Sequence, residues 1–114
     1  MKTKTKIALA TPKIRLCDPS YNVDLCIALA KEAETAGADI ILFPELTVTG
    51  ATAGDLFFQE RLITASEEAL KRYIENTAEL EVMSFIGAPV LYEGIIYNAV
   101  ICISEGEILG ISAK

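Results

Sequence analysis

The alternation of apolar and polar positions predicts a chain that begins with a strand, a helix and a second strand. Residues 6–11 have the composition of a strand that ends at Pro12, and residues 13–20 form a loop. A helix is expected over about 21–36, because apolar residues recur there at helical spacing. Residues 39–43 are apolar on both faces, which is typical of a buried central strand. This order predicts a right-handed βαβ unit with parallel strands.

Two helices are expected, and each has a recognisable inner face. The apolar face of the first helix is formed by Cys26, Leu29, Ala33 and Ala36. Gly37 suits the position just after its end, since glycine takes a positive φ at low cost. A loop over 44–58 leads into a second helix at roughly 59–80, and Thr64 with Glu67 has capping-box spacing, so this helix is expected to break or restart there. Its inner stripe comprises Leu62, Ser66, Ala69, Leu70, Tyr73, Thr77 and Leu80.

Three further strands are predicted at about 82–91, 95–104 and 107–112, with Glu93-Gly94 and Glu105-Gly106 as the turns between them. The fold class is therefore α/β, with about five strands and two main helices. Two helices can cover only one face of such a sheet, and these strands show almost no polar alternation. A sheet face that is apolar and left exposed favours aggregation. The face that the helices do not cover is therefore expected to pack against a second layer. The chain is thus expected to be a homo-oligomer or a fragment.

Composition narrows the possible functions. The 114 residues suit one small domain, 52% of them are hydrophobic, and the net charge is −6. Nucleic acid is not expected as the main partner of so acidic a chain. The absence of histidine excludes a Ser-His-Asp triad, a Cys-His pair and histidine-bound zinc within the chain. A basic cluster near the start forms either a solvated strand edge or a phosphate-binding face; it comprises Lys2, Lys4, Lys6, Lys13 and Arg15.

The three cysteines point to a structural role in a reducing compartment. Cys17, Cys26 and Cys102 form no CxxC pair and no metal-like spacing, and no metal site is expected. Their odd number, together with a polar N-terminus that lacks a signal-like apolar region, indicates a cytoplasmic setting. No apolar stretch approaches the roughly 20 residues of a membrane span, so no membrane partner is expected.

Glu45 is the main candidate for chemistry. It follows Phe43-Pro44 just past the carboxyl end of the predicted central strand, where ligands bind in open α/β sheets. A carboxylate there is expected to be partly desolvated and to serve as a general base; alternatively, it caps a nearby turn. Lys114 also follows a strand, and its ammonium would stabilise an anionic intermediate if Glu45 lies nearby. Otherwise it is a solvated lysine.

The block Phe43-Pro44-Glu45-Leu46-Thr47-Val48-Thr49-Gly50 resembles the first catalytic block of the carbon–nitrogen hydrolase, or nitrilase, superfamily. The continuation Thr52-Ala53-Gly54-Asp55-Leu56-Phe57-Phe58-Gln59 is similar to the N-terminal glutaminase domains of glutamine-dependent NAD synthetases. The other matching blocks are Ala10-Thr11-Pro12-Lys13, Tyr21-Asn22-Val23, Tyr97-Asn98-Ala99-Val100 and Gly106-Glu107-Ile108-Leu109-Gly110. The resemblance implies that residues 1–114 are the first half of a nitrilase-like α-β-β-α sandwich and a partial glutaminase domain.

The resemblance also implies roles for individual residues. The superfamily uses a Glu-Lys-Cys triad, in which Glu45 would be the general base and Lys114 would steady the tetrahedral intermediate. The nucleophilic cysteine belongs to a later block, so the chain alone is expected to be inactive. Ala51 stands where the family usually has tyrosine, which would line the substrate pocket, and Ala113 stands where it usually has proline.

In the complete proteins of this group, glutamine is the substrate and its ammonia amidates nicotinic acid adenine dinucleotide to NAD. ATP and magnesium are expected in the synthetase domain, which is absent here, and no cofactor is expected in this chain. Two alternatives stay open. One is a fragment of another carbon–nitrogen hydrolase, such as an amidase or nitrilase. The other is a non-catalytic assembly module.

Overall fold

A computed structural model describes residues 4–50 and 56–113, and the side chains of residues 56–59 lie outside this description. Its elements in chain order are β1 (Ile7–Leu9), α1 (Pro19–Thr35), β2 (Ile40–Leu42), α2 (Leu56–Asn76), β3 (Met83–Tyr92), β4 (Ile95–Ser104) and β5 (Glu107–Ala113). The strands form one sheet in the order β1-β2-β3-β4-β5. The first three are parallel, and the last three form an antiparallel meander. The predicted α/β class, with five strands and two helices, is confirmed.

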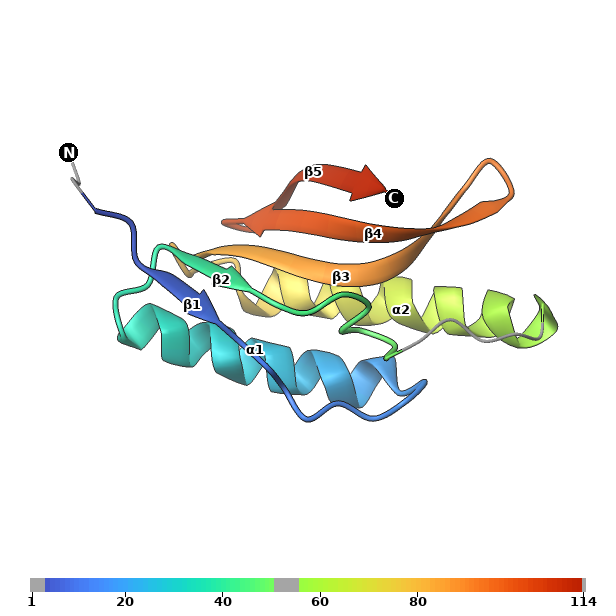
Figure 1. Ribbon diagram of the computed structural model, residues 1–114, viewed down its shortest axis with the longest axis horizontal. Helices are drawn as coiled ribbons and strands as arrows, with labels where there is room; N and C mark the ends of the chain where they lie inside the picture. Colours follow the sequence, from blue (N-terminus) through green and yellow to red (C-terminus); the bar gives the residue numbers. More distant parts are fainter. Residues whose placement is uncertain (1–3, 51–55, 114) are drawn as a thin grey trace.

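Both helices lie on the same face of the sheet (Figure 1). The main cluster of buried residues lies between them and the strands, and it comprises Val23, Cys26, Ala30, Val48, Ala69, Leu70, Tyr73, Ile86, Ala88, Ile101 and Ile103. Every residue of the stripe predicted for the second helix is buried or half-buried, but α2 ends at Asn76, so Thr77 and Leu80 follow the helix and are not part of it. On β4, Ala99, Ile101 and Ile103 point to the helices and are buried, whereas Val100 between them is 41% exposed. The expectation that two helices cover one face is therefore confirmed for the described residues.

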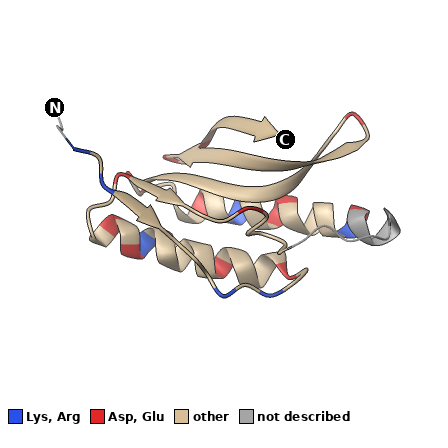
Figure 2. Ribbon diagram, in the orientation of Figure 1, with Lys and Arg blue, Asp and Glu red and all other residues tan. Residues whose placement is uncertain are grey.

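The uncovered face is apolar. Strands β3 and β4 carry no charged residue, and Figure 2 shows the acidic and basic residues mainly on the helices and the connecting segments. On β1, which is an edge strand of the sheet, the side chain of Leu9 is 77% exposed. None of the helices in the described part of the chain is long and apolar enough to cross a membrane.

Several details of the helices differ from the prediction. Helix α1 begins at Pro19, two residues early, because Asp18 caps it by accepting a hydrogen bond from the Tyr21 amide at 3.2 Å, and proline is favoured in a first turn. Ala36, predicted on the apolar face, is the exposed C-cap residue. Helix α2 begins at Leu56 and continues through Thr64 without a break, because the Thr64 hydroxyl donates to the Glu60 carbonyl one turn earlier and does not form a cap.

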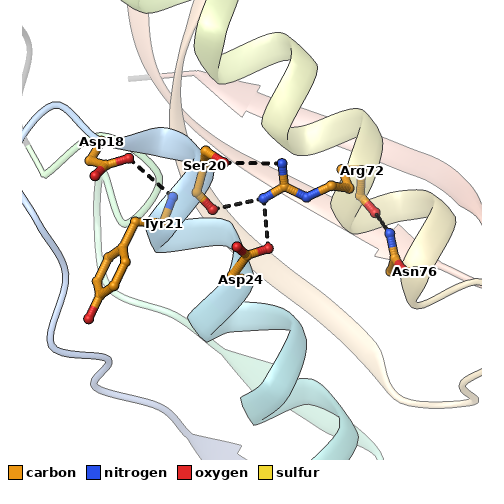
Figure 3. Close-up of polar contacts among 6 residues, drawn as sticks. All are labelled: Asp18, Ser20, Tyr21, Asp24, Arg72 and Asn76. Atoms are coloured by element: carbon orange, nitrogen blue, oxygen red, sulfur yellow. Dashed lines mark hydrogen bonds and ion pairs between the residues drawn. The ribbon is translucent and has the colours of Figure 1, made fainter.

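A polar contact joins the two helices on their outer side. Arg72 of α2 donates to the Ser20 carbonyl at 2.7 Å and to the Asp24 carboxylate at 2.8 Å, both on α1 (Figure 3). Asp24 is 67% exposed, so the ion pair itself adds little stability. The contact lies in the first turns of α1, the part of the helix that also contains Asn22.

Candidate active site

Glu45 lies at the carboxyl end of β2, as predicted. The ladder continues one residue past the strand, because the Phe43 amide donates to the Phe85 carbonyl at 3.0 Å. Pro44 has no amide hydrogen, so it ends the ladder and starts a turn. The turn is closed by the Thr47 hydroxyl, which donates to the Pro44 carbonyl, and by the Gly50 amide, which donates to the Leu46 carbonyl at 2.7 Å. Glu45 therefore projects from a backbone that is fixed at both ends.

The turn rests directly on strand β3 at Gly87. The Val48 amide donates to the Gly87 carbonyl at 3.1 Å. A Cβ atom added to Gly87 would lie 2.5 Å from the Leu46 nitrogen and 2.8 Å from the Pro44 carbonyl oxygen. Only glycine leaves room for this approach, so the residue on β3 determines how close the Glu45 backbone lies to the sheet.

The carboxylate of Glu45 is oriented by strand β4. The side-chain amide of Asn98 donates to one of its oxygens, and Asn98 lies opposite Pro89 in the sheet. The sequence pattern led us to expect a partly desolvated carboxylate, but Glu45 is exposed in the described chain. The reason is that the turn projects beyond the end of β2, so the flanking apolar strands do not enclose it. The amide of Asn98 orients the carboxylate, and a fixed direction toward the proton that it accepts is what a general base requires.

The other end of the turn is held by a buried asparagine. Asn22 of α1 is fully buried, and its side-chain nitrogen donates to the Val48 carbonyl at 2.9 Å and to the Arg15 carbonyl at 2.8 Å. Its oxygen accepts from the Arg15 amide at 2.7 Å. The Cys17 amide donates to the Thr49 carbonyl at 2.7 Å and adds a second link. The loop before α1 and the turn after β2 are thus joined into one unit.

The sequence indicated neither the role of Asn22 nor that of Asn98 or Gly87. The asparagines occur in blocks that match the superfamily, Tyr21-Asn22-Val23 and Tyr97-Asn98-Ala99-Val100, and these blocks were the available signal. Gly87 interrupts a run of larger apolar residues in β3, and a glycine inside a strand often marks close approach of another backbone.

Lys114 and Ala51 lie outside the described residues, and so does Gly54. The ladder between β4 and β5 ends with Ala113 paired to Ala99, which is the neighbour of Asn98. Ala113, the last described residue, is therefore paired with the residue next to Asn98, which contacts Glu45.

The three cysteines are free thiols. Cys26 is fully buried on the helix side of the sheet, and burial raises the pKa of its thiol to about 12, so it is protonated at neutral pH. Cys102 is on β4, four residues beyond Asn98, which corresponds to about 13 Å along a strand. The described residues contain no group of three or more acidic or cysteine side chains that could hold a metal ion.

The chain is similar to known proteins in sequence and in structure. Residues 6–114 match the family described as carbon-nitrogen hydrolase. The glutamine-dependent NAD(+) synthetase of Mycobacterium leprae is 31% identical over 109 residues, which are 96% of this chain and 16% of that protein. The crystal structure of a glutamine-dependent NAD(+) synthetase from Cytophaga hutchinsonii superposes with a TM-score of 0.85 at 27% identity, over 96% of this chain and 19% of the other. An amidase from Nesterenkonia sp. shares the fold, with a TM-score of 0.76 at 22% identity, over 96% and 42% of the two chains.

Proposed function

The chain belongs to the carbon–nitrogen hydrolase family, and on this basis we propose that it forms the first part of a domain that hydrolyses glutamine. The observation that carries the proposal is Glu45, a carboxylate on a fixed turn at the end of a parallel strand, with its side chain oriented by Asn98. Two named relatives, both glutamine-dependent NAD(+) synthetases, support glutamine as the substrate and NAD synthesis as the use of the ammonia. The chain spans 16% of the length of the mycobacterial relative, so the remaining steps belong to other parts of such a protein.

In this proposal Glu45 is the general base. It accepts the proton of a cysteine thiol as the sulfur attacks the carboxamide carbon of glutamine, and it returns that proton to the departing ammonia. Water, deprotonated by the same carboxylate, then cleaves the thioester. Lys114 stabilises the oxyanion of each tetrahedral intermediate.

The nucleophilic cysteine of this reaction lies outside the 114 residues. Burial and the raised pKa of its thiol speak against Cys26 of α1 as the nucleophile, and its position along β4, away from Asn98, speaks against Cys102. The part of the protein that would use ATP and magnesium also lies outside, and no residue of this chain is assigned to either. The apolar sheet face left uncovered by α1 and α2 supports packing against a further layer or a second copy.

The test uses the gene product that contains this chain, assayed for ammonia release from glutamine. Loss of a general base lowers turnover by roughly 10²- to 10⁴-fold, and this is expected for Glu45→Gln, which retains the shape of the side chain. Glu79→Gln, at an exposed position with no described side-chain contact, is the matched control and keeps full activity. Residues 1–114 expressed alone should release no ammonia. Full activity of Glu45→Gln, or turnover by the isolated 114 residues, would contradict the assignment.

A further inference from the structure

Gly87 has no side chain. The backbone of residues 44–46, which carries Glu45, therefore lies closer to it than a Cβ atom would permit. The three heavy atoms nearest to a Cβ at this position all belong to the backbone of residues 44–46, at 2.5, 2.8 and 3.1 Å. Backbone atoms cannot move aside as the end of a flexible side chain can. The Pro44–Leu46 segment would have to retreat from β3 as a unit.

The size of that retreat follows from the contact distance. Ordinary contacts of a Cβ atom begin near 3.4 Å, so the Leu46 nitrogen at 2.5 Å would have to move by about 0.9 Å. The segment has little freedom to do so. Leu46 has a φ of +51°, a conformation that few non-glycine residues adopt, and the following Val48 amide is bound to the Gly87 carbonyl.

Asn98 makes the carboxylate sensitive to this displacement. It is anchored on β4 in regular register with β3, whereas Glu45 is on the turn. When the turn moves away from the sheet, the carboxylate moves relative to the amide that orients it. Gly87 and Asn98 are in neighbouring strands on the same face, because Gly87 pairs with Val100 and Pro89 pairs with Asn98. The glycine thus fixes the backbone and the asparagine fixes the side chain.

We propose that Gly87 is a positioning residue for Glu45: its missing side chain sets the distance between the catalytic turn and the sheet, so that the carboxylate meets Asn98 in a reactive orientation. This inference rests on the proposed function for its activity readout, and on the geometry alone for its structural readout.

The experiment compares Gly87→Ala with Gly110→Ala in the complete gene product. Gly110 is also in a strand, and an added Cβ there meets nothing within 4 Å. Misplacement of a catalytic group by about 1 Å costs on the order of 100-fold in rate, so G87A should lower glutamine turnover about 100-fold, and G110A should change it less than twofold. In an E45Q background, G87A should have no further effect, because both changes act through the same carboxylate. A defect that is purely structural would instead lower the residual rate of E45Q as well.

Hydrogen exchange of the peptide over 43–50 gives a readout that does not depend on glutamine. G87A should speed exchange there, through loss of the Val48 and Gly50 amide bonds, while G110A should not. If the wild type releases no ammonia but G87A alters this exchange, the proposed function fails and the positioning role stands. If G87A changes neither exchange nor turnover, or lowers E45Q further, the positioning role is wrong. Should G87A fail to accumulate as folded protein, Asn98→Ala decides, since it adds no atom: it must lower turnover in wild type and leave E45Q unchanged.

Discussion

The hydroxyl groups of Tyr73 and Ser84 form a hydrogen bond of 2.6 Å inside the core, between α2 and β3. Tyr73 is fully buried and Ser84 is 1% exposed. Burial raises the pKa of the Tyr73 phenol above its ordinary value, so it remains a hydrogen-bond donor throughout the physiological range. Tyr73→Phe keeps the ring, including its edge-to-face contact with Phe43 at 6.2 Å between centroids. It therefore removes only the bond and leaves the serine hydroxyl buried without its donor.

The expected loss of stability follows from the Ser84 hydroxyl that is left without a donor. A buried polar group that loses its partner destabilises a protein by about 1–3 kcal/mol, whereas removal of both partners is nearly neutral. Tyr73→Phe and Ser84→Ala should each carry this cost, and the double variant should cost less than the two together. Tyr92→Phe, at a tyrosine that is 63% exposed, is the matched control and should cost nothing measurable.

Cys26 provides the assay, because it is fully buried in the same cluster as Tyr73 and becomes accessible only when that cluster opens. Its rate of alkylation under native conditions therefore reports the free energy of local opening, in a gene product of any length. A cost of about 1–3 kcal/mol corresponds to labelling that is roughly 5- to 150-fold faster. Two results would refute the reasoning. One is unchanged labelling in both single variants, and the other is a double variant whose acceleration equals the product of the single effects.

Two further predictions concern Asn22 and Cys26. Asn22→Ala removes three hydrogen bonds from a fully buried position, so it should destabilise the protein by at least about 2 kcal/mol and speed hydrogen exchange over both 14–18 and 46–50; exchange that is unchanged in 46–50 would show that the asparagine does not hold the turn. The folded thiol of Cys26 keeps its proton up to a pKa of about 12, whereas an unfolded thiol loses it near 9.0, so deprotonation favours the unfolded chain as the pH rises above 9. The melting temperature should therefore fall more steeply between pH 8 and 10 in the wild type than in Cys26→Ala, and parallel slopes would contradict this.

Features that depend on local sequence were predictable to within a residue or two. The hairpins of β3–β4 and β4–β5 are one example. Glu93 and Gly94 have φ values of +49° and +78°, and Glu105 and Gly106 repeat the pattern. Tight hairpin turns require positive φ at both central residues, and glycine at the second position signals them directly. The strand bounds followed from these turns because the register of a hairpin is fixed by its turn.

Features that depend on distant contacts were not predictable from the pattern. Asn98 contacts Glu45 across 53 residues of sequence, and Asn22 contacts Val48 across 26. The start of α1 was placed too late because Asp18-Pro19 resembles a loop until the cap is seen to form with the Tyr21 amide. The predicted break in α2 failed because a threonine hydroxyl inside a helix has a nearer acceptor in the preceding turn, the Glu60 carbonyl.

Four elements hold the turn that carries Glu45: the end of β2, Gly87 on β3, Asn98 on β4 and Asn22 on α1. Each acts on the backbone or on the direction of the carboxylate, and none of them encloses it, since Glu45 is exposed. Orientation of a general base and exclusion of water from it contribute separately to the rate of proton transfer. The described residues supply the first. In the proposed function, water exclusion would come from the bound substrate or from protein outside these residues. Substitutions at Gly87 and Asn98 should therefore change how often the carboxylate is correctly placed more than they change its basicity.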